Sequence, residues 1–368
     1  MSHSFSKLFE PTEIGRHVAK NRIFMAPMSR YRAPDRDIPP DLTQTYYRQR
    51  AGAGLIVAES TKINAWAGGT NCPGIYADEQ VDAWKKVTEG VHAEGGLIFL
   101  QLWHSGRAAH QSLMPEGQHV SAPSALGSQT EVMTANGMEV PTVPRALTLE
   151  QIVELRADYA TASRNALKAG FDGVEIHAAG GFLIDSFLQA PTNLRKDDYG
   201  GPLENRFRFL GEVLDDATEI WGADRVGIKL SPTSDYNDMG EGDVLETFTY
   251  VIEQLNTYGL AFLEVNEEMP MTEASAGNRA ILDRLQALWT GPYIANGNYD
   301  ATSGDKRILD GKADAITFGR LFIANPDLPA RFANGGLFNE LDPQTFYGGD
   351  HRGYTDYPVL QKISDVAA

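Results

Sequence analysis

Eight short apolar stretches, each followed by a helix-like stretch, constrain the fold of this chain more than any other feature. Residues 78–94, 148–169, 204–221, 243–258, 278–289 and 302–310 have helical periodicity with capping residues or glycine near their ends. The predicted strands are residues 22–28, 55–60, 97–104, 173–179, 225–232, 261–267, 292–298 and 315–322. Alternating units of this kind predict a parallel sheet covered by helices, and eight of them predict closure into a barrel. We therefore expect an α/β fold with a single (β/α)8 TIM barrel, and one domain spanning residues 1–368.

Two segments fall outside this alternation. Residues 110–144 are rich in Ser, Pro, Gly and Met and follow the third strand. In a barrel this loop lies at the active-site face, so we expect a lid-like insertion there rather than a second domain. Residues 6–21 are expected to form a short hairpin that closes the opposite end of the barrel.

Charge and cysteine content narrow the possible partners and the compartment. The 49 acidic and 32 basic residues give a formal net charge of −17, which disfavours nucleic acid and anionic membrane surfaces as partners. Cys72 is the only cysteine, so an intramolecular disulfide is excluded. The first residues lack a signal-peptide pattern, and no apolar run of about 18 residues occurs. We expect a soluble cytoplasmic protein that acts on a small molecule.

Polar residues recur at the carboxyl ends of the predicted strands, where barrels of this kind build their active sites. They are Ser29, Gln101, His104, His177, Lys229, Asn296 and Arg320. Gly297 and Gly319 end the last two strands, and exposed backbone N–H groups there with a neighbouring Arg320 are typical of a phosphate site. The chain has neither a P-loop nor a GxGxxG fingerprint after its first strand, and no ligand spacing predicts a metal site.

Several long segments resemble the Old Yellow Enzyme family, in particular its bacterial FMN-dependent ene-reductase and nitroester reductase branch. These segments are "FMAPMSRYRA", "HAEGGLIFLQLWHSGR", "FDGVEIHAA", "NLRKDDYGGPLENRFRF", "FGRLFIANPDL" and "GYTDYP", in order over residues 9–358. The resemblance implies FMN as cofactor and NADH or NADPH as reductant. It also implies a ping-pong reaction in which hydride passes through flavin N5 to the β carbon of an α,β-unsaturated carbonyl or nitro compound.

The resemblance assigns roles to individual residues. Ser29 matches the residue that hydrogen-bonds flavin O4, and Gln101 matches the amide that pairs with the pyrimidine edge of the ring. Lys229 stands where the family usually has arginine beside flavin N1 and O2, a change that keeps the charge and loses the planar fork. The expected cofactor-binding residues are Pro27, Met28, Ser29, Ser60, Gln101, Lys229, Asn296, Gly297, Asn298, Gly319 and Arg320.

The substrate pocket implied by the resemblance departs from the family in two positions. His177 matches the donor to the substrate oxygen and is the expected catalytic residue, whereas Trp66, Tyr354 and the lid-loop Arg145 match pocket positions. In "HAAGGF" the second oxygen donor is replaced by Gly180, and the tyrosine that protonates the substrate carbon is replaced by Phe182.

Three functions are compatible with these changes. One is an ene-reductase that takes its proton from solvent or another residue, such as Tyr354. Another is a flavoenzyme that needs no such proton, for nitro or nitrate-ester reduction, isomerisation or desaturation. The third is a flavin-binding protein with little turnover.

Overall fold

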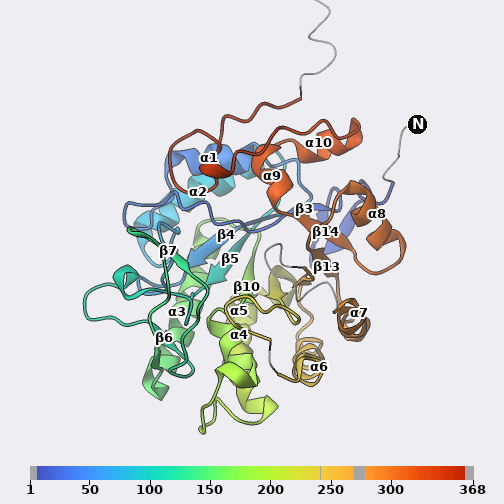
Figure 1. Ribbon diagram of the computed structural model, residues 1–368. Helices are drawn as coiled ribbons and strands as arrows, with labels where there is room; N and C mark the ends of the chain where they lie inside the picture. The colour runs from blue at the N-terminus through green and yellow to red at the C-terminus, as the bar shows by residue number, and fades with distance from the viewer. Residues whose placement is uncertain (1–5, 241, 269–277, 361–368) are drawn as a thin grey trace, which may run out of the picture.

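Eight parallel strands close into a barrel in the computed structural model, which describes residues 6–240, 242–268 and 278–360 (Figure 1). The strand order around the barrel is β10-β11-β12-β13-β14-β3-β4-β5. The barrel strands are β3 (Ile23–Met25), β4 (Ile56–Lys62), β5 (Ile98–Trp103), β10 (Gly173–Ala178), β11 (Val226–Leu230), β12 (Phe262–Asn266), β13 (Tyr293–Asn296) and β14 (Ala315–Phe318). The predicted (β/α)8 fold is confirmed, and each strand falls within the stretch predicted for it or within two residues of it.

Helices lie around the outside of the barrel (Figure 1). They are α1 (Asp41–Arg48), α2 (Asp78–Ala93), α3 (Leu149–Lys168), α4 (Leu183–Leu188), α5 (Leu203–Trp221), α6 (Val244–Leu255), α7 (Arg279–Leu288), α8 (Ala301–Leu309), α9 (Arg320–Ala324) and α10 (Leu328–Ala333). The helix α3 begins at a capping box, in which the Thr148 side chain accepts from the Gln151 N–H and the Gln151 side chain accepts from the Thr148 N–H. The six predicted helices are all present.

The last predicted strand is too long. Residues 320–322 belong to helix α9, because the extended chain ends at Phe318 and turns at Gly319. Phe322 is buried on the helix as deeply as a strand residue would be, and a short apolar run does not distinguish the two conformations.

The amino ends of the barrel strands are covered by the hairpin of β1 (Thr12–Ile14) and β2 (His17–Ala19), as predicted. Arg16 at its turn forms an ion pair with Asp224, with 2.7 Å between Nη2 and Oδ1. His17 Nε2 lies 3.3 Å from the backbone oxygen of Asp172. Asp172 directly precedes β10, and Asp224 lies two residues before β11. The hairpin therefore closes the amino end of the barrel.

The insertion after β5 contains β6 (Ser121–Ala122), the hairpin of β7 (Val132–Thr134) and β8 (Gly137–Glu139), and β9 (Arg145–Ala146) after it. The Gln129 N–H donates to Asp238 Oδ2 at 2.5 Å, and the Thr70 hydroxyl donates to the backbone oxygen of Met133. Asp238 and Thr70 follow β11 and β4, so the insertion contacts loops at the carboxyl end of the barrel. Its action as a lid stays a prediction.

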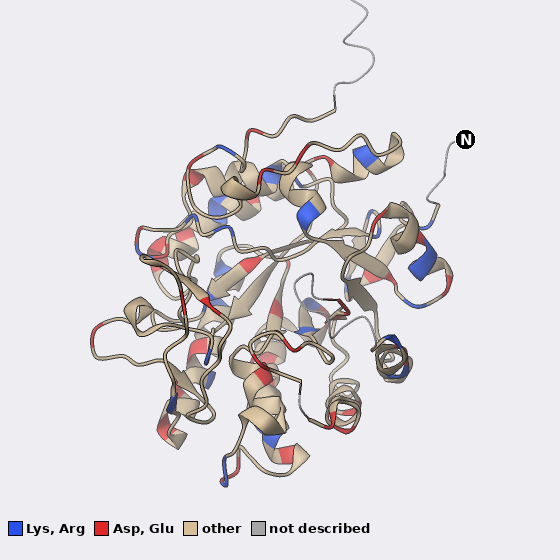
Figure 2. Cartoon of the chain, in the orientation of Figure 1, with Lys and Arg blue, Asp and Glu red and all other residues tan. Residues whose placement is uncertain are grey.

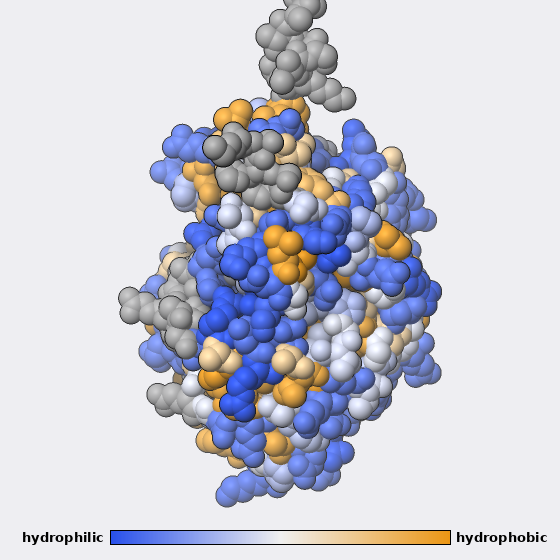
Figure 3. All heavy atoms as spheres, turned by 90° about the vertical axis from the view of Figure 1, so that its right-hand side faces the viewer, coloured by the Kyte–Doolittle hydropathy of each residue, from blue (hydrophilic) through white to orange (hydrophobic). Residues whose placement is uncertain are grey.

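The surface carries charges of both signs. Figure 2 shows Lys and Arg interspersed with Asp and Glu over the helices and loops. The face over α6, α7 and α8 is mainly hydrophilic, with apolar residues in small separate groups (Figure 3). Among the described helices none is both long and apolar enough to span a bilayer.

The carboxyl-terminal segment returns to the outside of the barrel through Tyr354. The Tyr354 ring is fully buried and stacks on Tyr46 of α1, with ring centroids 4.2 Å apart. The Arg32 guanidinium lies 4.3 Å from the Tyr354 ring centroid, and the Arg50 guanidinium lies 3.7 Å from that of Tyr46. These stacked rings and cations anchor the end of the chain to α1.

Tyr354→Ala should lower the free energy of unfolding by about 3–5 kcal/mol, because it empties a buried aromatic site and removes the stack on Tyr46. Urea denaturation followed by circular dichroism measures the change. Val359→Ala, an exposed position in the same segment, should change it by no more than about 0.5 kcal/mol. An equal effect of the two substitutions would contradict this account of the anchor.

Candidate active site

Gln101 lies at the centre of a buried hydrogen-bonded chain inside the barrel. Ser60 Oγ donates to Gln101 Oε1 at 2.6 Å, and Gln101 Nε2 donates to Glu175 Oε1 at 2.7 Å. The β4–β5 register shifts between Ala58 and Thr61, at the position of Ser60. Burial, together with the nearby Glu264 carboxylate, raises the pKa of Glu175. The Gln101 amide is thereby fixed in one orientation, with one N–H still to donate.

Lys229 is the buried cation of the barrel. Its Nζ lies 2.5 Å from Glu264 Oε1, and the lysine and glutamate side chains are 9% and 1% exposed. Thr317 Oγ1 donates to the other oxygen of Glu264 at 3.0 Å. Lys229 and Glu264 come from the neighbouring strands β11 and β12 and are directly paired in register, whereas Thr317 comes from β14, two strands beyond β12. Each charge therefore compensates the other where water is excluded.

His177 is a neutral hydrogen-bond donor. Burial, with the Lys229 charge beside it, lowers the pKa of His177 to about 3. Its Nδ1 accepts from the Ala179 N–H at 3.3 Å, so the ring proton is on Nε2. His177 and Lys229 are paired across β10 and β11. The site therefore offers a neutral imidazole N–H next to a lysine cation.

Aromatic side chains surround His177. The Phe182 ring meets the His177 ring edge to face, with centroids 5.1 Å apart, and meets Trp103 in the same way at 5.3 Å. Trp66 packs against His104 at 4.8 Å, and burial lowers the pKa of His104 to about 3. Phe182 and Trp66 are half-buried. These rings give the surroundings of His177 an apolar character.

The rim formed by β13 and β14 fits a phosphate. Neither Gly297 nor Gly319 has positive φ, and a Cβ added to them would meet neighbours only at ordinary contact distances of 3.4 Å and 3.6 Å or more. Neither the fold nor the packing of the described residues therefore requires glycine at these two positions. Close approach of a phosphate to the backbone would require it. Arg320 Nη2 donates to Asn298 Oδ1 at 2.8 Å on the exposed rim.

This donor set fits FMN. A neutral amide suits the ring edge of a flavin mononucleotide, and a lysine cation suits its N1–O2 region. Bare backbone at a cationic rim suits its phosphate. Asn296 donates to the backbone oxygen of Thr317 at 3.0 Å, beside this rim. Pro27, Met28 and Ser29 follow β3 and are half-buried, and Met28 Sδ lies 3.6 Å from where a Cβ of Gly319 would be.

Two predicted pocket residues lie apart from this group. Tyr354 was expected in the pocket, and the structure does not place it there: its ring packs on α1 outside the barrel and its hydroxyl lies 3.4 Å from Thr43 Oγ1. The sequence motif around Tyr354 contains no information on which side of the strands it packs. Arg145 is exposed in β9, which pairs with β6 in the insertion, so its role stays a prediction.

Several residues near the site were not among the predicted site residues. Glu175 and Glu264 stand within apolar strands, and a charged residue in such a strand is itself a signal of a buried partner. Tyr236 follows β11 and borders Gly180. Tyr31 stacks on Tyr347, with centroids 4.9 Å apart. The spacing of tyrosines in loops does not indicate in the same way that they lie near the site.

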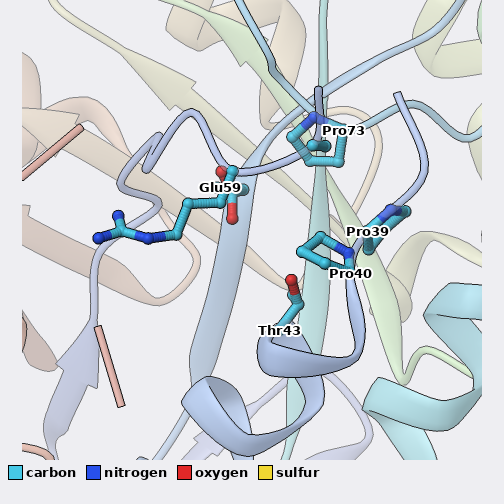
Figure 4. A pocket seen from close by; sticks show the side chains of 7 residues that line it. Pro39, Pro40, Thr43, Glu59 and Pro73 are labelled. Atoms are coloured by element: carbon cyan, nitrogen blue, oxygen red, sulfur yellow. The ribbon is translucent and has the colours of Figure 1, made fainter. Parts of the chain in front are cut away.

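Two hollows elsewhere do not belong to the site. Figure 4 shows a narrow recess, without room for a water molecule, lined by Arg32, Ala33, Pro39, Pro40, Thr43, Glu59 and Pro73. Burial raises the pKa of Glu59 to about 7, and its carboxyl accepts from the Arg30 N–H at 3.0 Å and the Tyr47 hydroxyl at 3.3 Å. A hollow of about 590 Å³ at the amino end of the barrel is lined in part by Arg22 and Asp314.

Comparisons with known proteins agree with this geometry. Residues 7–338 match the NADH:flavin oxidoreductase / NADH oxidase family. The chain is 40% identical over 364 residues to 12-oxophytodienoate reductase 1 of Oryza sativa subsp. japonica, covering 97% of this chain and 94% of that protein. It is 38% identical over 366 residues to a probable flavin mononucleotide-dependent alkene reductase of Leishmania infantum, covering 98% and 99%. The structure of an Old Yellow Enzyme homologue from Zymomonas mobilis aligns with a TM-score of 0.91 and 40% identity, covering 96% and 100%.

Lys229→Met should destabilise the FMN-free protein by about 3–5 kcal/mol, because the Glu264 carboxylate is left buried without a cation. Urea denaturation of the apoprotein measures this loss. Lys306→Met, which breaks an exposed ion pair with Asp310, should cost no more than about 1 kcal/mol.

The double variant Lys229→Met with Glu264→Gln removes both charges and should recover most of the stability. A double variant no more stable than Lys229→Met would show that the lysine contributes by packing rather than by charge.

Proposed function

The chain belongs to the Old Yellow Enzyme family of NADH:flavin oxidoreductases and is an FMN oxidoreductase, and from this premise we propose that it reduces activated alkenes with NADH or NADPH. The proposed substrates are α,β-unsaturated carbonyl or nitro compounds. The observation that carries the proposal is the neutral His177 N–H held beside the Lys229 cation.

We propose that Gln101 and Lys229 hold the flavin ring and that Gly297, Gly319 and Arg320 hold the phosphate. When bound in this way, FMN would supply the hydride-transfer chemistry that connects the reduced nicotinamide with the alkene. Lys229 favours a negative charge at the ring edge that it faces, and Glu264 keeps its ammonium in place.

His177 orients and polarises the substrate. Its Nε2–H donates to the carbonyl or nitro oxygen, so that negative charge developing on this oxygen is stabilised in the transition state. The Nδ1 contact with the Ala179 N–H prevents the ring from presenting an acceptor instead. Because the pKa of His177 is lowered to about 3, this neutral donor persists through the physiological pH range.

Gly180 and Phe182 distinguish this site from the usual pattern of the family. Gly180 brings no second donor to the substrate oxygen, so His177 acts alone. The Phe182 ring packs on His177 and has no proton to give. This observation favours a second candidate function, in which the substrate needs no carbon protonation: nitro or nitrate-ester reduction, isomerisation or desaturation.

We also propose that the whole chain works as one FMN-binding barrel. The barrel strands come from residues 23–318, and the segment that follows packs back on α1 through Tyr354. The insertion after β5 contacts loops at the carboxyl end of the same barrel.

The test of the proposed function is the oxidative half-reaction. The purified protein is reduced anaerobically by light and mixed with 2-cyclohexenone or with a nitro compound that has no activated alkene, and the return of oxidised flavin absorbance is followed. Reoxidation by cyclohexenone within a catalytic time is expected. Reoxidation by the nitro compound alone would overturn alkene reduction in favour of the second candidate.

His177→Ala should slow reoxidation by cyclohexenone by about 10²–10³-fold, because it removes a hydrogen bond that strengthens in the transition state. His351→Ala, at an exposed position in the carboxyl-terminal segment, is the matched control and should leave the rate unchanged. Loss of less than about fivefold in the His177 variant would contradict the role of His177 as the only oxygen donor.

A further inference from the structure

Alkene reduction needs a proton for the carbon next to the activating group, and Phe182 has none to offer. We propose that the hydroxyl of Tyr236, in the loop after β11, donates this proton. The proposal rests on the proposed alkene reduction and names a further catalytic residue for it.

Tyr236 and Phe182 flank the same point. A side-chain carbon placed on Gly180 would lie 3.3 Å from Phe182 Cε2 and 3.8 Å from Tyr236 Cδ1. Phe182 in turn contacts the ring of His177. A substrate whose oxygen accepts from His177 and that uses the space beside Gly180 therefore has both the Phe182 ring and the Tyr236 ring next to that space.

The loop that carries Tyr236 is fixed against the Gly180 turn. The Gly180 N–H donates to Ser231 Oγ at 2.7 Å, and Asn237 Nδ2 donates to the Gly180 oxygen at 2.7 Å. The Tyr236 N–H donates to Ser234 Oγ at 3.2 Å. Residues on both sides of Tyr236 thus hold it in place, which is the pre-organisation that proton transfer from a positioned acid requires.

The Tyr236 hydroxyl is free to react. Within residues 6–240, 242–268 and 278–360 it has no hydrogen-bond partner, and its side chain is half-buried, so water reaches the phenol. Burial raises the pKa of Tyr236 above its usual value of about 10, which keeps the proton on the phenol at neutral pH.

The other tyrosines nearby fit the role less well. Tyr354 is fully buried on α1, as described above. Tyr347 is 56% exposed and stacks on Tyr31, and the atoms nearest to a carbon placed on Gly180 belong to Phe182 and Tyr236.

The β carbon gains a hydride that derives from NADH or NADPH, and the electron pair of the C=C bond moves to give an enolate whose oxygen is held by His177. The α carbon of the enolate then takes H⁺ from the Tyr236 O–H, which leaves a phenolate. Water reprotonates the phenolate, so the substrate gains two electrons and two hydrogens and the tyrosine is restored.

Tyr236→Phe tests this assignment, because it deletes the proton and keeps the ring. Reoxidation of the photoreduced protein by 2-cyclohexenone should slow by about 10²–10⁴-fold, as expected for loss of a positioned acid. Flavin reduction by NADPH and reoxidation by a nitro compound without an activated alkene should stay within about twofold of the unmodified protein. Tyr347→Phe is the matched control and should leave all three rates unchanged.

Three further measurements separate catalysis from a structural effect. The dissociation constant of cyclohexanone, a ligand that cannot be reduced, should be the same in both proteins. The cyclohexenone rate should be flat with pH and fall only in alkaline solution as the phenol ionises, because burial raises the pKa of Tyr236, and this fall should be absent in Tyr236→Phe. The double variant Phe182→Tyr with Tyr236→Phe should be reoxidised by cyclohexenone at least tenfold faster than Tyr236→Phe alone.

A failure of the Tyr236 assignment and a failure of the proposed alkene reduction give different results. A Tyr236→Phe protein that keeps its cyclohexenone rate within twofold, or a Tyr347→Phe protein that loses it instead, would overturn the assignment to Tyr236. Failure of cyclohexenone to reoxidise the unmodified protein would show that the proposed alkene reduction itself is wrong, and the role of Tyr236 would fall with it.

Discussion

The Lys229–Glu264 ion pair is the constraint on which the interior of this barrel depends. Both side chains are more than nine-tenths buried, so neither charge is tolerated without the other, and Thr317 fixes the orientation of the carboxylate. A cation held in this way keeps its position whether or not a ligand faces it. The positive charge next to His177 is therefore a fixed property of the fold, and it helps to keep the imidazole neutral.

The second half of the interior is held by hydrogen bonds instead, and burial there raises the pKa of Glu175. Ser60, Gln101 and Glu175 form a chain across β4, β5 and β10, and an irregular β4–β5 register accompanies it at Ser60. One wall of the barrel thus presents an oriented amide and the other presents an oriented cation. This division suits a ring system with a polar edge and an anionic edge, which is the chemistry expected of a flavin.

The turn at Gly180 joins the two strand-end loops that shape the substrate side. Ser231 and Asn237 from the loop after β11 bind its backbone, so the residues after β10 and those after β11 are positioned together. In the proposed mechanism, Gly180 brings no second donor and His177 is the single ligand of the substrate oxygen. The rings of Phe182 and Tyr236 both border the Gly180 position. We regard the apolar Phe182 and the phenol of Tyr236 as coupled features of one site.

The alternation of apolar runs and helix patterns determined the barrel, because secondary structure of this kind depends on local periodicity. Position at a strand end was sufficient to select Gln101, His177 and Lys229, since parallel strands bring their carboxyl ends together. Only the tertiary structure decided that Glu264 compensates Lys229, that Tyr354 packs outside the barrel and that Tyr236 borders Gly180. Those contacts join segments far apart in the chain, and they depend on how loops and helices pack rather than on any local pattern.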